Sequence, residues 1–108
     1  MISQTFIFDF TVPPKLAPMI FPNETMAGMR ARTTCFVIDG DLPLTFKWLK
    51  DGNLINPDDD IRITKLDSYT SMLVIDRIEE FHTGNYTCIA TNAAKVTKST
   101  AALSVSGM

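Results

Sequence analysis

The chain has 108 residues, the length of one typical domain, and its 45% hydrophobic and 20% charged residues are ordinary for a folded globular protein. The net charge is −2 and the ten lysines and arginines are spread along the chain, which argues against nucleic acid or anionic lipid as a partner. No apolar run approaches the roughly 18 residues that a bilayer span requires, so we expect no membrane insertion by this segment.

Residues 1–12 are rich in apolar side chains, but Asp9 interrupts them and no positive charge precedes them. This pattern makes a poor signal peptide. We expect residues 1–12 to be an irregular leader or an expression remnant, or else to add part of an edge strand, and residues 13–106 to form the folded domain.

Short segments with two-residue alternation follow one another along the chain. In the clearest, Ala31, Thr33, Cys35 and Val37 share one face of a strand. Seven or eight such strands separated by turn residues, with no useful helical period, indicate an antiparallel β-sandwich. The expected strands cover 15–21 (edge only, because of its prolines), 30–38, 44–49, 53–55, 61–66, 71–78, 84–92 and 95–106.

Asp51 and Gly52 predict a two-residue hairpin between two of these strands, because a type I′ turn needs positive φ at both positions. The acidic run Asp58, Asp59 and Asp60 could suggest a cation site. No second cluster of oxygen ligands completes a calcium shell, so we expect a solvated loop and no metal.

Cys35 and Cys88 each lie in an alternating apolar segment, and their wide separation excludes a compact CxxC site. Two reduced, buried thiols remain an alternative to a disulfide on these grounds.

A set of spaced motifs carries a family resemblance. It comprises Cys35; Trp48-Leu49-Lys50-Asp51-Gly52; Leu73-Val74-Ile75; and His82-Thr83-Gly84-Asn85-Tyr86-Thr87-Cys88. The chain resembles an immunoglobulin I-set domain of a cell-adhesion receptor over Pro13 to Val105. Pro13-Pro14-Lys15-Leu16-Ala17-Pro18 and Gly40-Asp41-Leu42-Pro43 are similar, more narrowly, to the Down syndrome cell adhesion molecule (Dscam) family of arthropods.

The resemblance implies an all-β, immunoglobulin-like (I-set) antiparallel β-sandwich with one inter-sheet disulfide, Cys35 to Cys88. It also implies that Trp48 packs against the disulfide and that the Tyr86 hydroxyl binds a backbone group at the corner before its strand. One departure is His82, where many such domains have an aspartate paired with an arginine. Arg62 would then need Glu79, Glu80 or Asp60 as its partner.

Two N-x-[ST] sequons, at Asn23 and Asn85, are candidate glycosylation sites in a secreted protein. Asn23 lies in a proline-bounded loop and is the better acceptor, whereas Asn85 begins a strand. Unmodified polar turn residues are the alternative at both positions.

Nothing in the sequence indicates an enzyme or a cofactor. The chain has a single histidine, and no nucleophile with its base, metal triad or phosphate-binding glycine loop is visible. The remaining classes are a structural I-set module, with reduced cysteines, and a recognition module that binds an identical copy or a different ligand.

We expect an extracellular recognition module in the ectodomain of a cell-surface membrane protein. The Dscam resemblance favours homophilic binding to an identical copy on an opposing cell, as a weak homodimer. Outward apolar residues favour the sheet with the strands named A, B, E and D in this fold, and its expected contact residues are Arg32, Thr34, Phe36, Met72, Val74 and Asp76.

Overall fold

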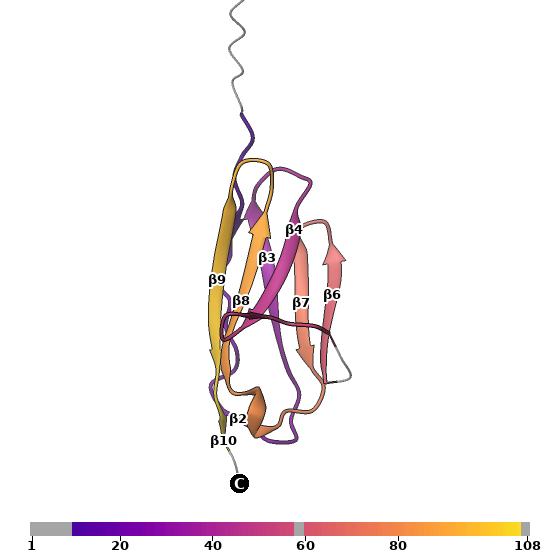
Figure 1. Cartoon of the computed structure of the whole chain (residues 1–108), viewed down its shortest axis with the longest axis vertical. Coiled ribbons are helices and arrows are strands. Elements are labelled where there is room, and N and C mark those ends of the chain that lie inside the picture. Colours follow the sequence, from indigo (N-terminus) through magenta and orange to yellow (C-terminus); the bar gives the residue numbers. More distant parts are fainter. Residues whose placement is uncertain (1–9, 58–59, 107–108) are drawn as a thin grey trace, which may run out of the picture.

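The computed structural model describes residues 10–57 and 60–106, and Figure 1 shows an elongated β-sandwich. The elements are β1 (Lys15–Leu16), β2 (Thr25–Met26), β3 (Ala31–Asp39), β4 (Thr45–Lys50), β5 (Asn53–Leu54), β6 (Ile61–Asp67), β7 (Thr70–Ile75), the 3-10 turn η1 (Glu80–His82), β8 (Gly84–Thr91), β9 (Val96–Leu103) and β10 (Val105–Ser106). Asp58, Asp59 and residues 1–9, on which the acidic loop and most of the expected leader fall, lie outside the described residues.

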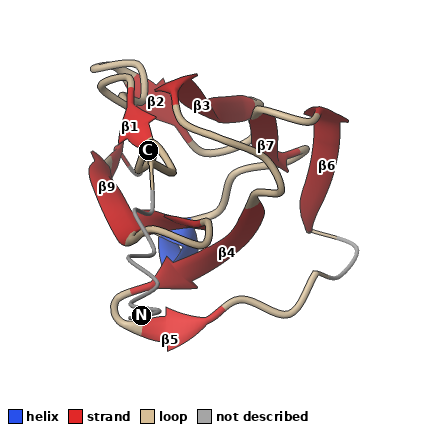
Figure 2. Ribbon diagram, turned by 90° about the horizontal axis from the view of Figure 1, so that it is seen from above, coloured by secondary structure: helices blue, strands red, loops and turns tan. Residues whose placement is uncertain are grey.

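Two four-stranded antiparallel sheets form the layers of the sandwich, as the view from above shows (Figure 2). The strand order is β1-β3-β7-β6 in one, called here the β6 sheet, and β5-β4-β8-β9 in the other, called the β9 sheet. A short parallel pair of β2 and β10 closes one side. The all-β antiparallel sandwich predicted from the alternation is confirmed.

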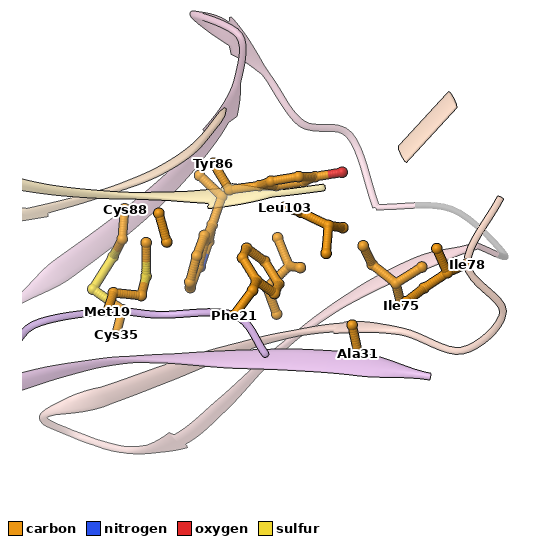
Figure 3. Packing of buried hydrophobic residues seen from close by; sticks show 12 residues of the cluster. Met19, Phe21, Ala31, Cys35, Ile75, Ile78, Tyr86, Cys88 and Leu103 are labelled. Atoms are coloured by element: carbon orange, nitrogen blue, oxygen red, sulfur yellow. A yellow bond between two sulfur atoms is a disulfide. The ribbon is translucent and has the colours of Figure 1, made fainter. Parts of the chain in front are cut away.

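The core lies between the sheets and follows the predicted alternation (Figure 3). Ala31, Thr33, Cys35 and Val37 of β3 are buried, and the side chains that alternate with them are exposed. From the opposite sheet, Tyr86 and Cys88 of β8 are fully buried. Burying a large apolar side chain stabilises the fold by about 1.5–3 kcal/mol, so these two strands provide much of the stability.

The segment before β3 differs from the single edge strand expected over residues 15–21. β1 pairs with β3 for two residues only, and β2 then forms a separate parallel pair with β10. Prolines on this segment cannot donate to a strand ladder, which explains the interruption. Between the two strands Met19 and Phe21 insert into the core. The Phe21 and Tyr86 rings pack edge to face there, with 5.3 Å between their centroids.

Val12, expected in the leader, is bonded to the sandwich. Its N–H donates to Asp41 Oδ2 at 2.8 Å, and its carbonyl accepts from Asn92 Nδ2 at 2.7 Å. The start of the folded unit at residue 13 stays a prediction.

Candidate protein-binding face

A disulfide joins the two sheets at the centre of the molecule. Cys35 of β3 and Cys88 of β8 are bonded, which confirms the predicted pairing and removes the alternative of two free thiols. Trp48 is buried on β4, opposite Cys88 in the ladder, and its indole N–H donates to Ser71 Oγ at 2.9 Å. The disulfide therefore fixes the distance between the two sheets, and the residues on their outer faces stand on a rigid framework.

The corner before β8 is built around Tyr86. Its hydroxyl donates to the His82 carbonyl at 2.6 Å, and burial, with a smaller effect from the negative charge of Asp51, raises the pKa of Tyr86 well above its usual range. His82 is buried in η1, and its Nδ1 accepts the Glu79 N–H at 2.8 Å. The histidine thus caps the turn.

The outer face of the β6 sheet carries the six residues predicted to bind a partner; we call these six the recognition face. Strand register aligns Arg32 of β3 with Val74 of β7, and Thr34 with Met72 one step along. Phe36 lies one step further on β3. Arg32, Thr34 and Phe36 are exposed, while Met72 and Asp76 are partly buried.

Val74 corrects one expectation. It was predicted to offer exposed apolar area, but only 6% of its surface is accessible. Val74 is aligned with Arg32 on one side and Arg62 on the other, and Arg30 lines the same hollow of about 430 Å³. Long arginine stems readily cover apolar surface, so Val74 forms the floor of a basic hollow instead of an apolar contact.

Asp76 is the partner of Arg62, and the expectation of Glu79, Glu80 or Asp60 in that role was wrong. Arg62 Nε and Nη2 donate to the two Asp76 carboxylate oxygens at 2.7 and 2.8 Å. Arg62 is on β6, and Asp76 directly follows the neighbouring strand β7, an adjacency that the sequence alone does not reveal. Hydrogen bonding to Arg62 holds the pKa of Asp76 below its usual range, and the same contact raises the pKa of Arg62.

The other end of the same sheet carries exposed apolar side chains beside two aspartates, Asp39 and Asp41. Phe36 is 43% exposed, Ile38 is 53% exposed and Tyr69 is 39% exposed, and the three line a hollow of about 380 Å³. Sequence reasoning missed Tyr69 because it precedes β7 in a turn, outside any alternating pattern. The backbone connects it to this end, since the Val37 N–H donates to the Tyr69 carbonyl at 2.9 Å.

Comparison with known proteins places this geometry in a family. The sequence model described as "Immunoglobulin I-set domain" matches residues 14–105. The chain belongs to the immunoglobulin I-set domain family. The immunoglobulin domain family and the relatives described below are not enzymes, which agrees with the prediction from the sequence.

Relatives of this I-set domain include cell adhesion molecule Dscam2 of Drosophila melanogaster, 44% identical over 94 residues, and human cell adhesion molecule DSCAM, 41% identical over 92 residues. The alignments cover 87% and 85% of this chain but only 4% of either relative. The Dscam1 Ig7 domain, isoform 5, superposes with a TM-score of 0.82 at 38% identity, covering 87% of this chain and 97% of that domain. A titin fragment, I67–I69, matches with a TM-score of 0.80 at 27% identity, covering 89% of this chain and 33% of the fragment.

The outer face of the β9 sheet carries hydroxyl and lysine side chains. Thr45 and Lys47 are exposed, and Thr87 forms a 2.8 Å hydroxyl contact with Thr100 across the ladder. Leu49 and Ile89 are partly buried, whereas Leu54 of β5 and Val96 of β9 are 60% and 51% exposed, so this sheet also has accessible apolar side chains.

The two sequons differ in backbone environment. Asn23 is exposed in a bend between β1 and β2. Asn85 is exposed within β8, but its N–H donates to Asp51 Oδ1 at 2.9 Å and its carbonyl accepts the Asp51 N–H at 2.8 Å. The first of these bonds lowers the pKa of Asp51, with a smaller effect from Lys50.

Within residues 10–57 and 60–106, no group of three histidine, cysteine, aspartate or glutamate side chains could hold a metal ion. The same part of the chain contains no helix long and apolar enough to cross a bilayer.

Proposed function

We propose that this I-set domain is an extracellular recognition module of a cell-adhesion receptor, and that it binds an identical copy through the recognition face. Its relatives at 41–44% identity are named cell adhesion molecules. The closed disulfide supports an oxidising compartment, and therefore the cell exterior as part of a membrane protein ectodomain, since such bonds are rare in the cytosol.

The observation that carries the proposal is the two-ended character of this face. Arg30, Arg32 and Arg62 gather at one end, whereas Phe36 and Ile38 are exposed at the other. A two-fold dimer uses the same patch on both partners, so the patch must complement itself when turned around. A basic end that meets an aromatic end satisfies this requirement.

The strand register defines how two antiparallel copies would align. We place the two-fold axis between the two faces, across the strands at the aligned pair Thr34 and Met72. Arg32 and Phe36 lie at equal distances along β3 on either side of Thr34, so the axis brings Arg32 of one copy to Phe36 of the other. An arginine over an aromatic ring contributes about 0.5–1 kcal/mol at an exposed site. The axis also brings Arg62 toward Asp67 of the second copy. Asp67 is level with Phe36 along the sheet, because both residues are aligned with Thr70 of β7.

The same register argues against pairing Arg32 of one copy with Asp76 of the other. Both residues lie at the same end of the face, and Arg62 of the same copy already holds the Asp76 carboxylate. An axis that joined them would have to move toward that end and would leave Phe36 outside the contact. We therefore centre the proposed interface on Thr34, Phe36 and Met72.

Sedimentation equilibrium of the whole chain over a concentration series tests the proposal. Phe36→Asp and Met72→Asp should abolish self-association, because each would bury an unpaired carboxylate twice, while circular dichroism stays native. Lys47→Glu, on the outer face of the β9 sheet, is the control and should leave association unchanged. Loss of association in the Lys47 variant alone would move the interface to the other sheet.

A chain that stays monomeric at millimolar concentration would refute homophilic binding. The same recognition face would then serve a different ligand, the heterophilic alternative. A purely structural I-set module is the other alternative, and the closed disulfide argues against the reduced cysteines that an intracellular version would have.

A further inference from the structure

We propose that a groove along one side of the sandwich, between β1 and β9, binds an extended acidic segment of another protein. The groove has a volume of about 390 Å³ and lies away from the recognition face, where the edges of the two sheets meet. It is defined by six of its lining residues and is called here the lysine groove: Pro14, Lys15, Leu16, Pro18, Lys95 and Lys98.

The charge of the groove gives the first argument. Three of the chain's six lysines, Lys15, Lys95 and Lys98, line it, and no lining residue is acidic. The net charge of the whole chain is −2, so the groove is positively charged on a chain that is negative overall. None of the three ammonium groups has an ion pair or side-chain hydrogen bond among the described residues, and Asp39, which is opposite Lys15 in the β1–β3 ladder, forms no ion pair there either.

The shape of the groove gives the second argument. β9 is the last hydrogen-bonded strand of its sheet, and β1 lies beside it across the groove without pairing with it. The facing wall contains Pro14 and Pro18, whose fixed φ makes it rigid and which offer no N–H of their own. Thr97 Oγ1 donates to the Pro14 carbonyl at 2.9 Å, which ties the two walls together near the start of β9.

These features fit one class of occupant. An extended segment can lie along the groove over β1 and β9, with its charged side chains directed to the lysines. It does not add a strand between them, because β1 and β9 have Cα atoms within 8 Å of each other and strands in a sheet lie about 4.8 Å apart. Carboxylates on the segment would meet lysines on both walls, and apolar side chains between them would rest on the half-buried Leu16. Because the lysines are exposed, we expect weak binding that decreases steeply with salt.

The test uses the whole chain and a fluorescein-labelled octapeptide of alternating glutamate and valine, followed by fluorescence anisotropy. The peptide should bind at 50 mM salt, at least tenfold more weakly at 300 mM, and not at all when lysine replaces glutamate. Lys15→Glu/Lys98→Glu should weaken binding at least tenfold. The matched control, Lys47→Glu/Lys65→Glu, changes the net charge equally on other surfaces and should bind as the wild type does.

Two further arms separate other occupants. Peptide N-methylated at the valines should bind as the unmodified peptide does, because its carboxylates and not its backbone hold it in the groove; loss of most of its affinity would indicate strand pairing and overturn the proposal. Tighter binding of a heparin-derived hexasaccharide than of the peptide, abolished by the same double variant, would assign the groove to sulfated sugars and overturn the proposal. Equal loss in both double variants, or no binding by wild type, would also overturn it. Self-association should be unchanged in all variants, so this outcome is independent of the recognition face.

Discussion

Removing the disulfide is the perturbation whose magnitude the structure specifies best. In Cys35→Ala/Cys88→Ala the unfolded chain regains the freedom of a loop whose ends are 53 residues apart, and chain-entropy arguments give a loss of about 4 kcal/mol for a loop of this length. Typical domains are stable by about 5–15 kcal/mol, so the variant should still fold, but with little margin.

The assay is urea unfolding followed by the fluorescence of Trp48, the single tryptophan, which is buried beside the bond. The midpoint should fall, and the m-value should rise because the unfolded state without the crosslink exposes more surface. Adding a reducing agent should bring the wild type close to the variant and leave the variant unchanged.

A stability loss below about 1 kcal/mol would refute the entropic reasoning, since cavity formation alone should cost that much at two buried positions. An unchanged m-value would show that the unfolded wild type is not restricted by the bond. Either result would assign the stability of the sandwich to its apolar core.

Three further predictions concern single residues. Tyr86→Phe removes the hydrogen bond to the His82 carbonyl and should lower the free energy of unfolding, measured in urea, by about 1–2 kcal/mol. Folding raises the pKa of Tyr86, so the stability of the wild type should decrease above about pH 10, and the decrease should be smaller in the variant. Gly40→Ala should cost about 1–3 kcal/mol in thermal unfolding, because φ is +148° and the new Cβ would lie 2.9 Å from Pro14 Cα; a neutral effect would contradict this geometry. Asn23→Gln should lower the mass of the protein secreted from eukaryotic cells by one glycan, and an unchanged mass would exclude modification at this exposed site.

The parts predicted well from the sequence are those that local rules determine. Alternation located β3 and β8, because strands with one buried face repeat every two residues. The hairpin at Asp51 and Gly52 is confirmed, since both have positive φ, +48° and +84°, and Lys50 pairs with Asn53 across the turn.

The errors arose where neighbouring strands decide the outcome. Val74 has the alternation of an outward residue, yet arginines from both adjacent strands cover it. Asp76 binds Arg62 only because β6 and β7 pair in one particular register. Such contacts depend on which strands are adjacent, and alternation within one strand contains no information about its neighbours.

The same alternation explains how one strand can serve both fold and recognition. On β3, Cys35 and Val37 face the core, while Thr34 and Phe36 face outward. The inward residues are fixed by a disulfide and by dense packing, where even one added or lost methylene is costly. The outward residues contact solvent and can change without disturbing that packing. A domain that binds through this face, as proposed, can therefore vary the outward residues of β3, and with them the choice of partner, while the inward half of the same strand preserves the sandwich.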